Sequence, residues 1–127
     1  MILAALLLVQ AAVIVDERAT VRDEAPPHGA IGMSTAYRIS DGVPGRTMEF
    51  RRRELHPRAA IGVHPIDHDE VYYVLSGHGV LEADGVQSRL GPGMAAYLRA
   101  GSRVGIRQVG KQRLSLIISY PLAKPAP

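Results

Sequence analysis

The feature that most limits the fold of this chain is its division into short, strand-like runs by turn residues. The runs are rich in β-branched and aromatic residues, and glycine, proline or an Asp-Gly pair bounds most of them. Asp84-Gly85 is the strongest hairpin signal, because these residue types accept the positive φ of a two-residue turn. Strands are expected within residues 33–40, 46–55, 56–64, 71–75, 80–90, 94–98, 103–109 and 113–120. Apart from the apolar N-terminus, no segment combines helical length with a 3.6-residue period, so the sequence predicts an all-β sandwich or barrel.

Length and composition indicate one small domain. A chain of 127 residues can bury a core of its own, and the absence of Cys excludes disulfides, thiolate metal sites and Cys nucleophiles. The net charge is only +3, and the densest basic run is Arg51–Arg53. Neighbouring residues of a strand face opposite sides, and no aromatic residues interleave with this run. We therefore expect solvated strand positions there and no nucleic-acid partner.

The N-terminal segment is apolar from residue 2 to residue 15 except for Gln10. It is shorter than the ~18 residues of a membrane span and fits the core of a signal peptide with cleavage after Ala11. No Lys or Arg precedes it, and the alternative is the first strand of a cytoplasmic protein. We expect residues 1–15 to be a signal peptide or apolar leader. Cleavage would mean an exported protein, periplasmic or secreted, without stable membrane insertion; otherwise the protein would be cytoplasmic.

Composition divides the rest of the chain into three segments. Residues 16–32 are charged and then Pro-rich, and we expect them to form an N-terminal arm. Residues 33–121 hold all the expected strands and are predicted to form a single barrel domain. The last segment, residues 122–127, is rich in proline and is predicted to be a disordered tail.

Three stretches of the chain together resemble a known family. They are IGVH at 61–64, DEVYYVLSGHG at 69–79 and RLGPGMAAYLRAGS at 89–102. Their order and spacing are similar to those of the cupins, over about residues 47–120. The resemblance implies a single-domain jelly-roll β-barrel that is often dimeric. It also implies that residues 33–40 add a strand to a partner subunit, so we expect a homodimer.

The resemblance also implies a metal site, because cupins usually hold a divalent metal with two His and one Glu in the first motif and one His in the second. His64 and Glu70 match two of these positions, whereas Ile66 and Val104 occupy the other two. His68 lies two residues before Glu70 and would share its face on an extended strand. The candidate ligands are therefore His64, His68 and Glu70, for Fe, Mn, Ni or Zn.

A metal-free interpretation of the same residues stays open. His68 can instead be a loop residue bonded to Asp67, Asp69 or solvent, since the chain must turn between strands here. Without a metal, His64 and Glu70 remain candidates for catalytic acid and base. The other histidines, His28, His56 and His78, are assigned to the arm and to turns.

Alternation along the strands predicts which side chains line the barrel. If Glu70 points inward then so does Tyr72, and if Val104 points inward then so does Ile106. The predicted cavity is lined by His64, Ile66, Glu70, Tyr72, Val104 and Ile106. A mostly apolar lining with a few polar groups is typical of a small-molecule pocket, with Ile66, Tyr72, Val104 and Ile106 as the ligand-binding residues. Core packing is the alternative for Tyr72 and Ile106.

These observations leave three functional hypotheses, because the fold alone does not decide function. The first is a cupin that binds a small organic molecule in its barrel, with weak or absent metal dependence. The second is a metal-dependent enzyme of the dioxygenase, isomerase or lyase type that uses His64, His68 and Glu70. The third is a structural or sensory dimer whose barrel is simply packed.

Overall fold

The computed structural model describes residues 11–127, so most of the expected leader lies outside the described residues. One short 3-10 helix, η1 (Glu17–Ala19), precedes ten strands. The strands are β1 (Val21–Glu24), β2 (Ser34–Tyr37), β3 (Met48–Leu55), β4 (Ala60–Pro65), β5 (Glu70–Ser76), β6 (His78–Ala83), β7 (Val86–Leu90), β8 (Ala95–Leu98), β9 (Arg103–Val109) and β10 (Leu114–Pro121). Within residues 11–127, no helix has the length and apolar character needed to cross a membrane.

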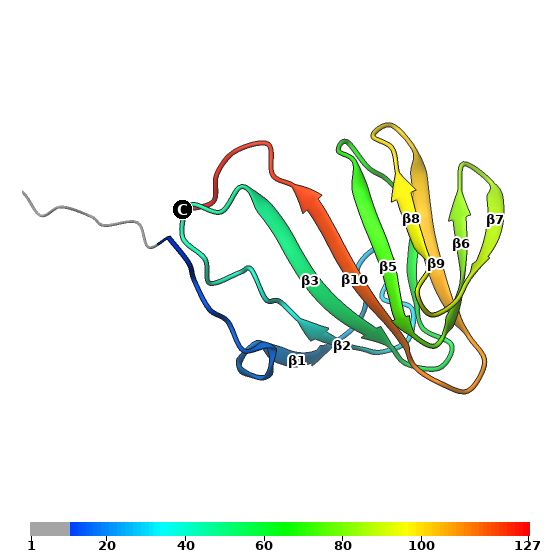
Figure 1. Cartoon of the computed structure of the whole chain (residues 1–127). Coiled ribbons are helices and arrows are strands. Elements are labelled where there is room, and N and C mark those ends of the chain that lie inside the picture. Colours follow the sequence, from blue (N-terminus) through cyan, green and yellow to red (C-terminus); the bar gives the residue numbers. More distant parts are fainter. Residues whose placement is uncertain (1–10) are drawn as a thin grey trace, which may run out of the picture.

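The strands form two antiparallel sheets that close into a jelly-roll barrel (Figure 1). The six-stranded sheet has the order β1-β2-β3-β10-β5-β8, and the four-stranded sheet has the order β4-β9-β6-β7. The predicted all-β barrel is therefore confirmed. The predicted hairpin is also present: Ala83 pairs with Val86, and Asp84 and Gly85 between them both have positive φ.

The hydrophobic core lies between the two sheets and follows the alternation of the strands. Along β5, Tyr72 and Val74 are buried while Tyr73 and Leu75 are exposed. In β10, which lies between β3 and β5, Leu114 and Leu116 are fully buried. Burying a side chain of this size contributes roughly 1.5–3 kcal/mol, so the inward residues of these central strands are the main source of stability.

The expected N-terminal arm differs from a free segment, because part of it joins the six-stranded sheet. β1 pairs with β2 of the same chain, from Val21 opposite Tyr37 to Glu24 opposite Ser34. β2 in turn pairs with β3. In the chain described, both edges of β2 are thus hydrogen-bonded to strands of the same chain, and the addition of this segment to a partner subunit stays a prediction.

The C-terminal residues also differ from the disordered tail that proline content suggested. The backbone N–H of Leu122 donates to the carbonyl of Thr47, and that of Ala126 donates to the carbonyl of Arg46, each at 2.9 Å. The N–H of Gly45 donates to the carbonyl of Pro127 at 3.4 Å. Proline removes donors but leaves acceptors, so residues 122–127 can still run beside residues 45–47.

Candidate functional site

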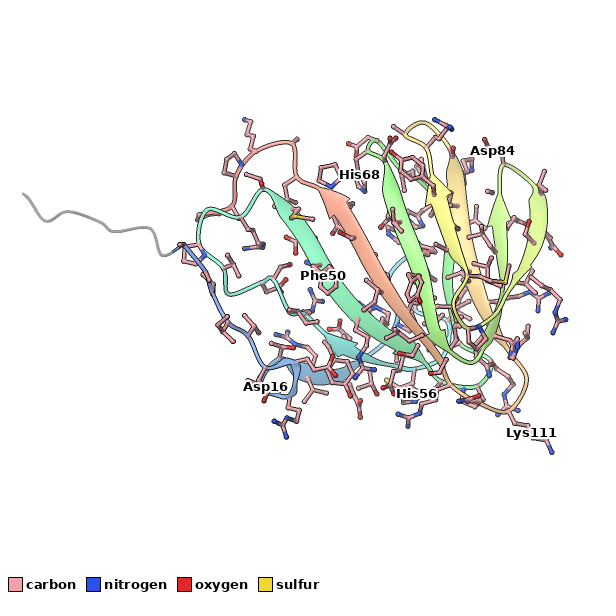
Figure 2. The ribbon with its side chains drawn as sticks, in the orientation of Figure 1. Asp16, Phe50, His56, His68, Asp84 and Lys111 are labelled. Atoms are coloured by element: carbon pink, nitrogen blue, oxygen red, sulfur yellow. The ribbon has the colours of Figure 1, made fainter. Side chains whose placement is uncertain are left out.

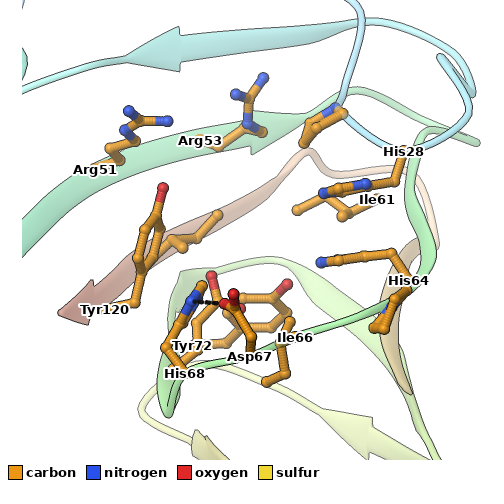
Figure 3. A pocket seen from close by; sticks show the side chains of 14 residues that line it. His28, Arg51, Arg53, Ile61, His64, Ile66, Asp67, His68, Tyr72 and Tyr120 are labelled. Carbon is orange, nitrogen blue, oxygen red and sulfur yellow. Dashed lines mark hydrogen bonds and ion pairs between the residues drawn. The ribbon is translucent and has the colours of Figure 1, made fainter. Parts of the chain in front are cut away.

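A cavity of about 280 Å³ opens at one end of the barrel. Its wall is formed by β3, β4, β5 and β10, by the loop between β4 and β5, and by residues 27–28, which precede β2. Five of the residues singled out in the sequence line it: His64, Ile66, His68, Glu70 and Tyr72. Figure 3 shows four of these side chains, His64, Ile66, His68 and Tyr72, around the cavity, and Figure 2 places His68 at the opposite end of the molecule from His56. The sequence therefore located the cavity and much of its wall.

Two other expected wall residues lie elsewhere. Val104 and Ile106 on β9 are 0% and 2% exposed and belong to the hydrophobic core rather than to this cavity. Val104 pairs across the ladder with His64, so it stands beside the cavity residue without reaching the open space. Alternation predicted that both residues point inward, but it could not predict that other core side chains would cover them.

Glu70 is the most unusual residue of the site. It begins β5, is 6% exposed, and its Oε2 atom is buried without a hydrogen-bond partner among residues 11–127. Burial raises the pKa of Glu70, and the charge of His68 opposes that rise. Burial, together with the charge of Glu70, also raises the pKa of the neighbouring Tyr72 phenol well above its usual value. The floor of the cavity thus carries a carboxyl group and a neutral phenol.

His64 presents one ring nitrogen to the cavity. Its Nδ1 atom lies 2.8 Å from the carbonyl oxygen of Gly62. Because a carbonyl only accepts hydrogen bonds, Nδ1 carries the proton, and in the neutral ring Nε2 keeps its lone pair. Figure 3 shows a His64 ring nitrogen directed into the cavity. Nε2 can therefore accept a proton or a hydrogen bond from a bound molecule.

His28, which the sequence assigned to the arm, forms part of the cavity wall. Its ring stacks on His64, with ring centroids 3.5 Å apart and planes 6° from parallel. Burial lowers the pKa of His28, and the charge of His64 lowers it further. Sequence reasoning missed this residue because nothing local shows that the Pro-Pro-His-Gly stretch folds back over β4.

Gly62 allows the segment around His28 to lie against β4. A Cβ atom at position 62 would be 1.8 Å from the carbonyl oxygen of His28. A β-bridge between Ile31 and Ala60 holds the following residues in place. Glycine permits this close backbone approach, because it has no Cβ atom to collide with the carbonyl oxygen.

His68 is a loop residue whose side chain also reaches the cavity. It lies in the loop between β4 and β5, and its Nδ1 is 2.9 Å from Oδ1 of Asp67. Its ring also lines the cavity and stacks on Tyr120 of β10, with centroids 4.5 Å apart. Tyr120 is a further wall residue that the sequence analysis did not identify.

Arg51 and Arg53 form the remaining polar wall, on the inner face of β3. The sequence correctly placed them opposite Arg52, but the expectation that they are solvated was wrong for Arg53, which is 6% exposed. Arg53 donates to Ser34 Oγ at 2.7 Å and to Glu24 Oε1 at 3.1 Å. These partners compensate a buried charge that would otherwise be costly.

Comparison with known proteins adds the family to this geometry. A family model described as "Cupin domain" matches residues 51–120, which is more than half of the chain. The chain belongs to the cupin family. A search of the curated proteins finds no match. The predicted resemblance is thereby confirmed, and it covers the motifs that hold His64 and Glu70.

Solved structures similar to this cupin show the same fold. A predicted oxalate decarboxylase from Thermotoga maritima superposes with a TM-score of 0.76 at 21% identity, covering 87% of this chain and 99% of that one. A Cupin 2 conserved barrel domain protein from Salinispora arenicola gives 0.67 at 18% identity, covering 91% and 92%. KdgF from Halomonas sp. gives 0.60 at 19% identity, covering 69% and 78%.

The residues of this cupin do not fit a cupin-type metal centre. In the part of the chain that the structure describes, no three His, Asp or Glu side chains form a group that could hold a metal ion. Ile66 and Val104, at two of the four expected ligand positions, are buried hydrocarbon side chains. The stacked rings of His28 and His64 are nearly parallel, so their in-plane lone pairs do not converge on one ion.

Proposed function

We propose that this cupin binds a small organic molecule in the cavity, with weak or absent metal dependence. The observation that carries the proposal is the carboxyl group of Glu70, which lines the cavity and has no hydrogen-bond partner among the described residues, its Oε2 atom being buried as well. Buried polar atoms are nearly always hydrogen-bonded, and one left unsatisfied costs about 1–3 kcal/mol. A bound molecule that hydrogen-bonds to Glu70 would remove this cost.

The shape of the cavity supports the same proposal. Its volume of about 280 Å³ is close to the lower end of small-molecule pockets, which begin at roughly 300 Å³. Ile61, Ile66 and Ile118 supply apolar wall, and the polar groups stand at separate places around it. The third hypothesis, a barrel that is merely packed, is disfavoured by an open cavity of this size.

The proposed site also has the groups for proton transfer. His64 Nε2 is available as a base, and the raised pKa of Glu70 favours its acid form. We assign these two residues as the catalytic pair if the bound molecule is also converted. Neither role requires an ion.

The second candidate is a metal-dependent enzyme of the dioxygenase, isomerase or lyase type. It is favoured by one observation, namely that His64, His68 and Glu70 all line the same cavity. Elemental analysis of untagged protein beside its His68→Ala variant separates the two candidates. About one metal ion per chain, lost in the variant, would support the enzyme and contradict metal-independent binding.

The direct test of binding is a fragment screen by two-dimensional NMR on the full chain, with and without EDTA. We expect fragments to shift the resonances of Ile66 and Ile118, to bind equally well in EDTA, and to bind more weakly to Glu70→Gln. Glu82→Gln on β6 is the matched control, because Glu82 lies outside this cavity. A screen in which no fragment of any charge reaches the cavity would overturn the proposal.

The homodimer and the cleaved leader stay predictions. Light scattering tests the first and N-terminal sequencing of the purified protein tests the second.

A further inference from the structure

We propose that the molecule bound in this cavity is a small organic carboxylate whose anionic end is held by Arg51, with Arg53 beside it. The inference rests on the proposed function, because it names the chemical class of the ligand of that same site. It concerns the wall of the cavity formed by β3, which lies apart from His64, His68 and Glu70.

The first step is the placement of the two arginines. Arg51 and Arg53 are two residues apart on β3, so they project from the same face of the strand. Arg51 is opposite Ile118 of β10 and Arg53 is opposite Leu116. Both guanidinium side chains line the cavity, and Figure 3 shows them side by side along one wall.

The second step is that Arg51 has hydrogen-bonding capacity to spare. Its Nη2 atom lies 3.1 Å from Asp41 Oδ1 and 3.3 Å from Glu49 Oε2. Its Nε atom, by contrast, is buried and has no partner within residues 11–127. A guanidinium group has five N–H donors in a planar fork that matches a carboxylate. A ligand cannot reach the buried Nε atom, but Nη1 also has no partner among these residues and is not one of the buried atoms. Its N–H groups are therefore the donors that remain accessible for a bound carboxylate.

The third step is the position of the arginine's existing partners. Asp41 and Glu49 are bound through Nη2, which shares an edge of the guanidinium group with Nε, and they fix the orientation of the group without using Nη1. Glu49 is itself held by Arg46 and Ser40, each at 2.7 Å. The donor is thus supported by a network that orders it before any ligand arrives, which lowers the entropic cost of binding.

The acidic wall residues leave room for an anion at this end. Asp67 is almost fully exposed to solvent. Glu70 is on β5, which β10 separates from β3, so the two backbones are roughly 10 Å apart. Coulomb energy falls with distance, so a carboxylate in contact with Arg51 is attracted more strongly than Glu70 repels it. Asp41 and Glu49 lie against Arg51 and also repel an anion, but the ion-pair network that holds them has four arginines, Arg38, Arg46, Arg51 and Arg53, against three carboxylates. The isoleucines between Arg51 and Glu70 suit a short hydrocarbon body.

The test compares ligands that differ in charge but hardly in shape. Binding of 3-methylbutanoate and benzoate, each beside its amide, is measured by NMR titration of the full chain. The proteins are the wild type, Arg51→Gln, Arg51→Lys and the control Arg107→Gln, which lies on β9 outside the cavity. We expect carboxylates to bind the wild type about tenfold or more tightly than amides. Arg51→Gln should remove that preference, Arg51→Lys should keep part of it, and Arg107→Gln should keep all of it.

Each outcome decides the question. Equal binding of acids and amides to the wild type, or a preference that survives in Arg51→Gln, overturns the carboxylate assignment and leaves the proposed function intact. If neutral or cationic fragments bind the cavity and carboxylates do not, the assignment is also wrong while binding stands. If no fragment of any charge binds, the proposed function itself fails. Should Arg51→Gln not fold, the wild-type preference and the Arg51→Lys variant decide alone.

Discussion

The imidazole rings of His28 and His64 lie face to face, with centroids 3.5 Å apart and planes 6° from parallel. One ring comes from the segment before β2 and the other from β4, so the stack joins the N-terminal region to the barrel wall. The contact turns a segment that looked like a loose arm into one side of the cavity. We expect the stacked pair to control access to the cavity, because both rings line it.

Gly62→Ala tests how this segment is held. The new Cβ would lie 1.8 Å from the His28 carbonyl oxygen, and because that atom is backbone, the segment must move. We expect faster cleavage of residues 25–32 by proteinase K, read by mass spectrometry, and a loss of about 1–3 kcal/mol in unfolding free energy. Gly42→Ala is the control, since a Cβ there meets no atom within 4 Å. Equal protection of residues 25–32 in both variants would mean that the close approach does not hold the segment.

Glu70→Gln should reveal the cost of the buried carboxyl group. Burial raises the folded-state pKa of Glu70 above 4.5, so the folded protein favours the protonated carboxyl group. The stability that this group contributes to folding is complete below pH 4.5 and is lost as the pH rises through the folded-state pKa. We therefore expect the variant to gain stability relative to wild type with rising pH, by about 1–3 kcal/mol near neutrality. Urea unfolding between pH 4 and 8 measures the difference. A difference independent of pH would contradict this account.

Glu49→Ala should destabilise the protein strongly. Glu49 is 2% exposed and binds Ser40, Arg46 and Arg51. Burial is the largest single influence on the pKa of Glu49 and raises it. The hydrogen bonds from Ser40 and Arg46 and the charges of Arg51 and Arg46 together outweigh burial, so the pKa is lowered overall. Removing it leaves Arg46 without an acidic partner and Arg51 with Asp41 alone, at a cost of about 3–5 kcal/mol in guanidinium unfolding at pH 7.

The control for that variant is an exposed ion pair. Asp16→Ala breaks the pair with Arg18, whose side chain is 86% exposed, and should leave the unfolding midpoint almost unchanged, because solvent screens the pair. The pH dependence of Glu49→Ala gives a second check. Because the pKa of Glu49 is lowered, the stability that Glu49 contributes to folding is present above pH 4.5 and is lost as the pH falls through the folded-state pKa. Similar losses for the two variants at pH 7 would show that the buried network contributes little.

Restoring two histidines should create the metal dependence that the present residues do not support. Ile66→His with Val104→His supplies the two missing ligand positions, and Val104 already stands opposite His64 in the ladder. We expect the double variant to gain thermal stability with Zn²⁺ and to lose it with EDTA. Wild-type protein should show no such shift. A wild-type melting temperature that falls in EDTA would instead favour the metal-dependent enzyme.

The local pattern of the sequence was enough to predict the barrel and one part of its site. Asp84-Gly85 marks its hairpin because turn chemistry is local, and period-two alternation places Glu70 and Tyr72 on one inward face. The residue types at positions 66 and 104 likewise show, from the sequence alone, that hydrocarbon side chains occupy two of the four expected ligand positions. Each of these inferences depends on residues that are close together in the chain or in a known motif.

Only the tertiary structure decided which groups meet inside the cavity. Alternation says that Arg51 and Arg53 share a face, but not that β10 pairs with β3 and β5 and thereby curves that face toward Glu70. Nothing near His28 in the sequence indicates that its partner is His64, because the contact depends on how closely two backbones approach at Gly62. Side-chain direction is fixed by the period of the strand itself, whereas the group that it faces is fixed by long-range pairing and packing.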